Sequence, residues 1–269
     1  MTNSLNIIPE KLAVVKIGGN IIDDEAQLSS FLNAFAAIDG KKILVHGGGK
    51  LATRVAEAMG ISQEMVNGRR ITDAETLKVV TMVYAGFINK NIVAQLQAAG
   101  CNAIGLSGAD GNIIQGHKRI ATTIDYGFVG DIDAVNAGFV KQLLSHNAAL
   151  VLSPITHNGN GQLLNTNADT IAQEIAKAMS AYYEVSLLYC FEKKGVLLDP
   201  ADDSSIIPVI DRLYFEKLKE DLVISAGMIP KLDNAFEALS AGVQHIFIGH
   251  AAELPQLILH QSGTSIVHE

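Results

Sequence analysis

Two patterns of apolar residues alternate along this chain. Short continuous apolar runs indicate buried strands, and we expect strands at residues 12–17, 42–46, 101–106, 148–153, 185–190, 245–249 and 264–266. Between these runs, apolar residues recur every three to four positions, which is typical of helices that bury one face. We expect helices at residues 24–40, 50–59, 73–99, 136–146, 169–179, 213–220 and 231–242.

Several helix ends are marked by their own residues. Asp23 or Asp24 can cap the first helix, and Gly40 is expected to end it. The stretch Thr72-Asp73-Ala74-Glu75 has the spacing of a capping box, and it opens a long helix that ends before Gly100.

Strands that alternate with helices predict an α/β fold, with a mostly parallel central sheet covered by helices on both faces. Two segments depart from this alternation. Residues 108–131 and a stretch that turns at residues 158–161 are expected to form β-hairpins outside the central sheet.

The chain has no polar linker long enough to separate two independent units, so we expect a single domain over residues 1–269. A change of composition near Asp169 divides this domain into two lobes, at about residues 1–168 and about 169–269.

Composition excludes several classes of partner. Of the 269 residues, 48% are apolar and the net charge is −8, so no basic surface is expected for nucleic acid. No apolar run approaches 18 residues, which argues against a membrane protein. Cys101 and Cys190 lie in apolar runs, as buried thiols of a reducing compartment do, so we expect a cytoplasmic protein. The eight histidines show no metal-ligand spacing, and no protein-bound metal is expected.

Two glycine-rich turns follow the first two strands. Lys16 stands at the tip of the first strand, before Gly18 and Gly19, where backbone N–H groups can approach a phosphate. The second strand leads through residues 47–49 into a helix, which is an anion-binding arrangement. This turn is not a Walker A loop, because Leu51 follows the lysine, and it lacks the dinucleotide-binding glycine pattern, which argues against a nicotinamide-dependent oxidoreductase.

Two further charged residues stand at helix starts, Asp169 and Lys231. Taken singly, such residues are usually caps or solvated charges. Ligands of open α/β sheets bind at the carboxyl ends of the strands, so these residues and Lys16 can converge there. Two lysines held by one aspartate could bracket a phosphoryl group, and phosphoryl transfer needs mainly positioning and charge stabilisation.

Five motifs, in order, carry a resemblance to a known family. They are Val15-Lys16-Ile17-Gly18-Gly19, Val45-His46-Gly47-Gly48-Gly49, Asn67-Gly68-Arg69-Arg70-Ile71-Thr72, Leu164-Asn165-Thr166-Asn167-Ala168-Asp169 and Gly227-Met228-Ile229-Pro230-Lys231. Together they resemble the amino-acid kinase family, and within it the acetylglutamate kinases, over roughly residues 12–266. The resemblance implies an αβα sandwich that uses ATP and Mg²⁺ to phosphorylate the side-chain carboxylate of N-acetyl-L-glutamate, a step of arginine biosynthesis.

The resemblance also implies a role for each matched residue. Lys16 and Lys231 would stabilise the transferring phosphoryl group, with Asp169 orienting both. The remaining roles concern binding: Gly48, Gly49, Arg70 and Asn165 would hold the acceptor, Arg70 by pairing with its α-carboxylate, and Gly18, Gly19, Ser225 and Gly227 would hold the nucleotide. The first lobe would then bind the acceptor, and the second lobe would bind the nucleotide. The phosphates of the nucleotide would supply most of the ligands of Mg²⁺.

Some features depart from the family pattern or leave alternatives open. Residues 189–195 lack an aspartate that family members commonly have near the adenosine, so no adenosine contact is assigned there. The chain begins shortly before its first strand, which favours a homodimer without arginine feedback, with the long helix at residues 73–99 as its contact.

The acceptor could instead be N-succinyl-L-glutamate, or glutamate, aspartate, carbamate or a nucleoside monophosphate. An alternative of another class is a non-catalytic module that senses a nucleotide.

Overall fold

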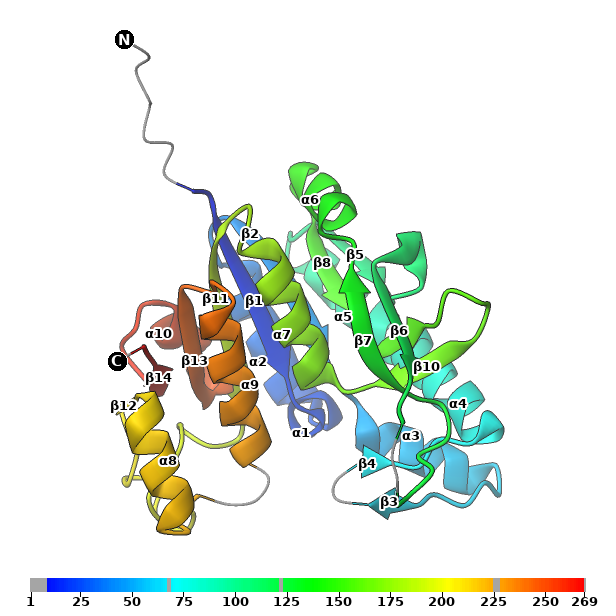
Figure 1. The fold of residues 1–269 in the computed structure, drawn as a ribbon. Helices are drawn as coiled ribbons and strands as arrows, with labels where there is room; N and C mark the ends of the chain where they lie inside the picture. The colour runs from blue at the N-terminus through cyan, green and yellow to red at the C-terminus, as the bar shows by residue number, and fades with distance from the viewer. Residues whose placement is uncertain (1–8, 67–68, 121–122, 225–227, 269) are drawn as a thin grey trace.

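The centre of the protein is a single large sheet. A computed structural model describes residues 9–66, 69–120, 123–224 and 228–268. Eight strands lie in the order β12-β14-β13-β11-β1-β2-β8-β5 (Figure 1). Their bounds are β1 Lys11–Ile17, β2 Lys41–His46, β5 Ala103–Leu106, β8 Ala149–Leu152, β11 Glu184–Phe191, β12 Val209–Ile210, β13 His245–His250 and β14 Thr264–Ile266. Neighbouring strands pair in parallel except β13 and β14, which confirms the predicted α/β fold.

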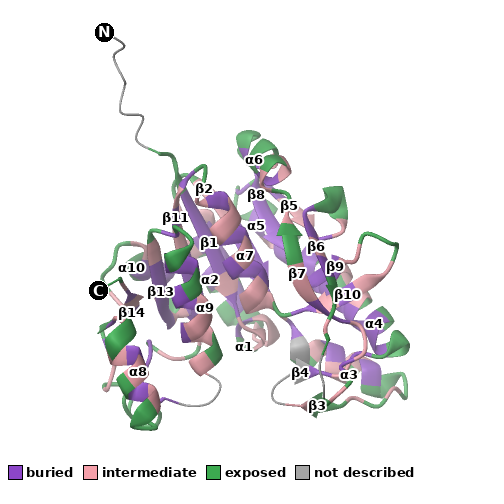
Figure 2. Cartoon of the chain, in the orientation of Figure 1, coloured by how far each residue is buried: buried purple, intermediate pink, exposed green. Residues whose placement is uncertain are grey.

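Helices cover both faces of this sheet because side chains alternate along each strand. In β1, Leu12 and Val14 belong to one buried cluster, whereas Ala13 and Val15 belong to the other. The first cluster packs against α6 Ala137–Ser145, α7 Ala168–Met179, α8 Arg212–Glu220 and α9 Ile229–Ser240. The second packs against α1 Gly19–Asp23, α2 Glu25–Ala36, α3 Gly49–Ala58, α4 Ala74–Val80, η1 Thr81–Ile88, α5 Asn89–Ala98 and α10 Leu254–Ile258. Burial is accordingly concentrated along the central strands (Figure 2).

The two predicted hairpins form and join each other outside the central sheet. One consists of β6 Ile114–Lys118 and β7 Val129–Val135, and the other of β9 Ile155–His157 and β10 Leu163–Thr166. Strand β10 pairs in parallel with β7, and the four strands close into a small barrel. The sequence predicted the hairpins but not their union, because the pairing of β7 with β10 joins segments far apart in the chain.

The remaining short elements are β3 Met65–Val66, β4 Arg69–Arg70, and the 3₁₀ turns η2 Asp110–Asn112 and η3 Ala251–Glu253. Both cysteines are buried free thiols, as expected. Within the part of the chain that the structure describes, no helix is long and apolar enough to cross a bilayer.

The long helix forms as predicted, but its details differ. Asp73, not Thr72, is its N-cap, because the Asp73 side chain accepts a hydrogen bond from the Thr76 N–H at 2.7 Å. Glu75 pairs with Lys78 instead of returning to the cap, so the capping-box prediction was wrong. The middle of the helix, η1, is a π-helix, a form that often occurs at functional sites.

Other helix ends are close to expectation. The Asp24 side chain caps α2 by accepting a hydrogen bond from the Gln27 N–H at 3.0 Å. That helix ends at Ala36 and not at Gly40. Gly40 has a φ of +83° and instead turns the chain into β2.

Candidate active site

The two glycine turns lie side by side at the carboxyl edge of the sheet. Ile17 and His46 are partners in the parallel pairing of β1 with β2, and the Gly47 N–H donates to the Ile17 carbonyl at 3.2 Å. Gly18 is the N-cap of α1, and no described atom lies within 4 Å of the position that a Cβ would take there, so its backbone is open to a ligand from that side. Gly48 is the N-cap of α3 and has a φ of +148°, a conformation that strongly favours glycine.

Three predicted charged residues meet beside these turns. The Lys16 Nζ lies 2.7 Å from Asp169 Oδ1, and the Lys231 Nζ pairs with Asp169 Oδ2. They come from the end of β1, the start of α7 and the start of α9, respectively, so only the tertiary fold brings them together. The Asp169 side chain is 14% exposed, which leaves this charge cluster only a narrow contact with solvent.

The charges of this cluster determine its ionisation. Burial alone would raise the pKa of Asp169, but the two ammonium groups outweigh burial and hold its pKa well below the ordinary value. Asp169 therefore stays an anion at physiological pH and keeps the two lysines about one carboxylate. A cluster with two positive charges and one negative charge can attract an additional anion, such as a phosphoryl group.

A cavity of about 190 Å³ opens next to the cluster. Its walls are made of Gly47, Gly48, Met65, Arg70, Tyr84, Arg119, Val129, Gly130, Pro154, Asn165, Thr166, Asn167, Ala168 and Thr170. Three of the four residues predicted to bind the acceptor, Gly48, Arg70 and Asn165, line this cavity. Gly49 follows as the first residue of α3.

Hydrogen bonds fix the polar side chains of this cavity. The buried Arg70 guanidinium donates to Thr53 Oγ1 at 2.8 Å and to Gln63 Oε1, which sets its plane in the wall. The Asn165 Nδ2 donates to Thr72 Oγ1 at 3.0 Å, and the Thr72 hydroxyl donates to the Arg70 carbonyl at 3.1 Å. Arg70 and Asn165, which come from distant strands, are thus connected through one threonine.

The cavity also contains an arginine that sequence analysis missed. Arg119 lies just after β6, and its Nε donates to both carboxylate oxygens of Asp131 at 3.0 and 3.1 Å. The Arg119 Nη1 is buried and has no hydrogen-bond partner among the described residues. The available signal was the predicted hairpin over residues 108–131, which contains both Arg119 and Asp131, but the sequence did not fix which residues face each other across it; in the structure His117 pairs with Asp131 and Lys118 with Gly130.

A second cavity, of about 250 Å³, lies in the C-terminal half. It is lined by Phe191, Lys193, Gly195, Val196, Leu197, Pro200, Ile224 and Met228. Ile224 immediately precedes Ser225 in the chain, and Met228 precedes Lys231 by three residues. The predicted nucleotide ligands Ser225 and Gly227 lie outside the described residues. No group of three His, Cys, Asp or Glu side chains that could hold a metal occurs within the described ranges.

The fold and site together define an α/β protein in which two lysines and one aspartate form a charge cluster at the carboxyl edge of the sheet. Residues 11–250 match the model of the amino acid kinase family. An acetylglutamate kinase of Bacteroides thetaiotaomicron is 58% identical over 96% of this chain and 98% of its own length. One from Methanopyrus kandleri is 38% identical over 88% of this chain and 94% of its own. The chain belongs to the amino acid kinase family.

Solved structures agree on the fold. The N-acetylglutamate synthase from Neisseria gonorrhoeae, complexed with coenzyme A and N-acetyl-glutamate, superposes with a TM-score of 0.82 at 20% identity, over 97% of this chain and 60% of that one. The carbamate kinase of Giardia superposes with a TM-score of 0.70 at 14% identity, over 97% of this chain and 99% of that one.

Proposed function

We propose that this protein transfers the γ-phosphoryl group of ATP to the side-chain carboxylate of N-acetyl-L-glutamate, in arginine biosynthesis. The product is an acyl phosphate, N-acetyl-glutamyl 5-phosphate. The observation that carries the proposal is the joint ion pairing of Lys16 and Lys231 with Asp169. Residues on either side of Asp169 line the first cavity, and a residue close to Lys231 lines the second. The names of relatives at more than 50% identity support the same activity.

The first cavity binds the acceptor. The Arg70 guanidinium pairs with the α-carboxylate, since its fork matches two carboxylate oxygens. The Gly48 and Gly49 N–H groups hold the carboxylate that is phosphorylated, at the positive end of α3. Asn165 hydrogen-bonds the acyl amide. Lys16 and Lys231 then neutralise charge on the phosphoryl group as it moves between donor and acceptor oxygens.

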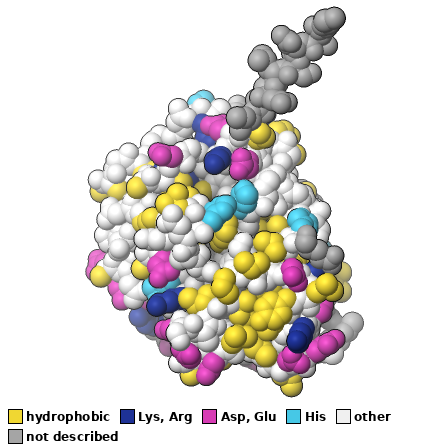
Figure 3. Space-filling model, turned by 90° about the vertical axis from the view of Figure 1, so that its left-hand side faces the viewer, with side chains coloured by type: hydrophobic (Ala, Val, Ile, Leu, Met, Phe, Trp, Pro, Cys, Tyr) yellow, Lys and Arg dark blue, Asp and Glu magenta, His cyan; other side chains and the backbone are white. Residues whose placement is uncertain are grey.

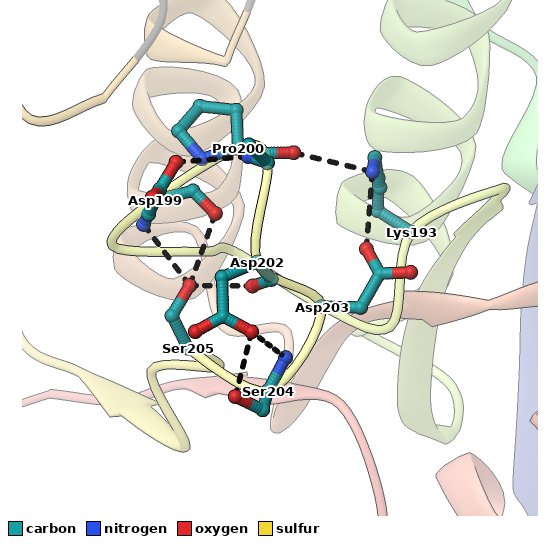
Figure 4. A network of polar contacts seen from close by, with 8 residues as sticks. Lys193, Asp199, Pro200, Asp202, Asp203, Ser204 and Ser205 are labelled. Atoms are coloured by element: carbon teal, nitrogen blue, oxygen red, sulfur yellow. Dashed lines mark hydrogen bonds and ion pairs between the residues drawn. The ribbon is translucent and has the colours of Figure 1, made fainter.

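The second cavity binds the adenosine. Its lining is mainly apolar, which suits an adenine ring, and Lys193 is its charged member. The loop around it is held by its own contacts (Figure 4): Lys193 Nζ donates to the Pro200 carbonyl and to Asp203 Oδ1 at 3.2 and 3.0 Å, and Ser205 Oγ lies 2.7 Å from the Asp202 carbonyl oxygen, to which it donates, and 3.0 Å from the Asp199 carbonyl oxygen.

The phosphates extend from the adenosine toward Gly18, Gly19 and the two lysines. Mg²⁺ is held mainly by ATP oxygens and water, in keeping with its preferred ligands. This division assigns acceptor binding to about residues 1–168 and nucleotide binding to about residues 169–269.

An ADP-release assay over several acceptors tests the proposal. With Mg-ATP, we expect N-acetyl-L-glutamate to be turned over, and glutamate, aspartate, carbamate and nucleoside monophosphates to give at most a background rate. Turnover of one of these alone would reassign the acceptor. Binding of ATP without ADP formation, whichever acceptor is offered, would support a nucleotide-sensing module instead.

Arg119 favours a second candidate acceptor, N-succinyl-L-glutamate. A succinyl group ends in a carboxylate where an acetyl group ends in a methyl, so it needs a cationic partner in the acceptor cavity. Asp131 holds one edge of the Arg119 guanidinium, and the buried Nη1 of Arg119 remains able to donate to a ligand oxygen.

The two acceptors are distinguished by the ratio of their kcat/KM values. If the succinyl compound is the substrate, its kcat/KM exceeds that of the acetyl compound at least about tenfold, the worth of one charged hydrogen bond. Arg119→Gln then abolishes this preference and leaves the acetyl reaction unchanged. An unaltered ratio in Arg119→Gln would exclude Arg119 as the selective contact.

The protein acts as a cytoplasmic homodimer without nucleic-acid or membrane partners. The contact is the long helix, where Met82 and Phe87 of η1 are 53% and 65% exposed. Apolar side chains of this size gain from burial against a second copy. On the face formed by the C-terminal elements, Lys and Arg side chains stand among acidic and apolar ones and make no continuous basic surface (Figure 3).

A further inference from the structure

His46 is a buried histidine that the proposed mechanism does not use. It ends β2, immediately before the glycine turn, and its side chain has no exposed surface. Its Nδ1 lies 2.8 Å from the Gly47 carbonyl oxygen, and its Nε2 lies 3.2 Å from the Asn89 Nδ2. A carbonyl oxygen can only accept, so Nδ1 carries the proton, and Nε2 accepts from the Asn89 amide. Both ring nitrogens are thus satisfied by one tautomer.

The hydrogen bond to the Gly47 carbonyl restrains a peptide plane that glycine alone would leave free. In a trans peptide the C=O and the following N–H point in opposite directions. With the Gly47 carbonyl held by the buried ring, the Gly48 N–H must point away from that ring. Glycines on both sides of this peptide would otherwise allow it to flip at little steric cost.

The same long helix supports both sides of this arrangement. Asn89 Nδ2 also donates to the Val151 carbonyl at 3.0 Å, and Lys90 Nζ donates to Asn89 Oδ1 at 3.0 Å. One residue earlier, the Ile88 side chain packs on the Gly48 Cα, where an added Cβ would lie 2.3 Å from Ile88 Cδ1. Asn89 therefore fixes the histidine, and Ile88 closes the back of the glycine turn.

We propose that His46 is a positioning residue, which fixes the Gly47–Gly48 peptide so that the Gly48 N–H is presented to the acceptor carboxylate. The inference rests on the proposed assignment of the first cavity to the acceptor. Without the Nδ1 donor, the peptide samples both orientations, and a flipped peptide presents a carbonyl oxygen to the anionic acceptor. Removing the donor therefore weakens the binding of the acceptor and leaves the binding of ATP unchanged.

Two substitutions distinguish the roles of the two ring nitrogens of His46. The side-chain amide of His46→Asn reaches the position of Nδ1, so it retains a donor to the Gly47 carbonyl. The amide of His46→Gln reaches the position of Nε2, so it retains the contact with Asn89 and loses that donor. We expect His46→Gln to raise the KM for the acceptor at least tenfold with the KM for ATP within twofold, and His46→Asn to stay within threefold for both.

Thermal unfolding of both variants provides the structural control. If the two lower the melting temperature equally but only His46→Gln weakens acceptor binding, the positioning role stands. A rise of both KM values in proportion to lost stability, or equal acceptor KM values in the two variants, would overturn it.

Arg70→Ala separates this test from the proposed function. It should raise the acceptor KM about tenfold or more if the first cavity binds the acceptor, because it removes the partner of the α-carboxylate. A normal acceptor KM in Arg70→Ala would mean that the cavity assignment is wrong. A raised KM there with a normal KM in His46→Gln would overturn only the role of His46.

Discussion

At the scale of single residues, Asp169 shows how a buried charge is kept. A carboxylate at a helix start is ordinarily a solvated cap, and here the capping belongs to its neighbour, since Asn167 Oδ1 accepts from the Asp169 and Thr170 N–H groups. Asp169 is thereby released to hold two lysines. Removing one partner of such a buried cluster leaves an uncompensated charge, so the three residues act as a unit.

Lys16→Ala and Lys231→Ala should each lower kcat much more than they raise either KM. In the proposed mechanism each ammonium stabilises charge that develops during transfer, and the loss of one such contact costs about 10²–10³ in rate. Steady-state kinetics measure both constants. Lys50→Ala, at an exposed position in the first turn of α3, is the control and should leave kcat unchanged. A loss of nucleotide affinity at constant kcat would contradict the assigned role.

His46 should make stability depend on pH. Burial, with the nearby charge of Lys90, lowers its pKa from 6.5 to about 4, although the hydrogen bond to Gly47 opposes the shift. The folded state favours the neutral form of His46. The contribution of His46 to stability is therefore complete above about pH 6.5 and is lost as the pH falls through 4. The free energy of unfolding, measured with denaturant, should fall by about 3 kcal/mol over this range because of His46.

His46→Asn is the comparison for this measurement. The pKa of the exposed His260 is also lowered, so this histidine affects stability in the same pH range in both proteins. Only the difference between the two proteins therefore reports on His46. Asp169 affects the pH dependence of stability only below this range, because its pKa in the folded state lies under its ordinary value. Equal pH dependence in the two proteins would show that His46 titrates normally.

At the scale of elements, the glycine turn and the long helix form one structural unit. The turn between β2 and α3 packs against η1, and α5 begins with the asparagine that holds His46. A π-helix changes the angular position of the residues that follow it. Within this unit, Tyr84 lines the first cavity and Phe87 is exposed, so the same helix contributes to the cavity wall and to the outer surface.

Gly48→Ala should disrupt this unit. The φ of +148° is strained for alanine, and the new Cβ would meet Ile88 Cδ1 at 2.3 Å. We expect the acceptor KM to rise about tenfold and the free energy of unfolding to fall by about 1–3 kcal/mol. Gly60→Ala is the matched control: its φ is +74° with nothing within 4 Å, so it should cost about 1 kcal/mol and leave KM unchanged.

At the scale of the whole molecule, the site lies where separate layers meet. Its charge cluster joins a central strand to two helices of one face, and the first cavity reaches from the other face to the small barrel. A ligand bound in this cavity would contact both parts. Association of two copies would add a further constraint, through the helix that supports the glycine turn.

Phe87→Glu and Met82→Glu should convert a dimer into a monomer. A carboxylate buried in an apolar contact loses its hydration without gaining a partner. Sedimentation analysis measures the change in mass. Leu213→Glu, at a position 69% exposed on α8, is the control and should leave the assembly unchanged. A wild-type monomer, or a dimer that survives both substitutions, would place the contact elsewhere.

The sequence by itself determined what depends on local pattern. Apolar runs and helical spacing predicted every strand of the central sheet except β12, because a two-residue strand is too short to show a pattern. Motif resemblance predicted the family, which the comparisons confirm. It also pointed to Lys16, Asp169 and Lys231 before any geometry was known.

Only the tertiary structure decided what depends on contacts between distant segments. The closure of the two hairpins into a barrel placed Arg119 in the wall of the first cavity, and no local signal in the sequence marks an arginine as part of a cavity wall. The packing of the long helix on the glycine turn gave His46 its partner, 43 residues away in the chain. Periodicity reports which face of an element is buried, whereas the identity of its neighbour is fixed by how the layers pack.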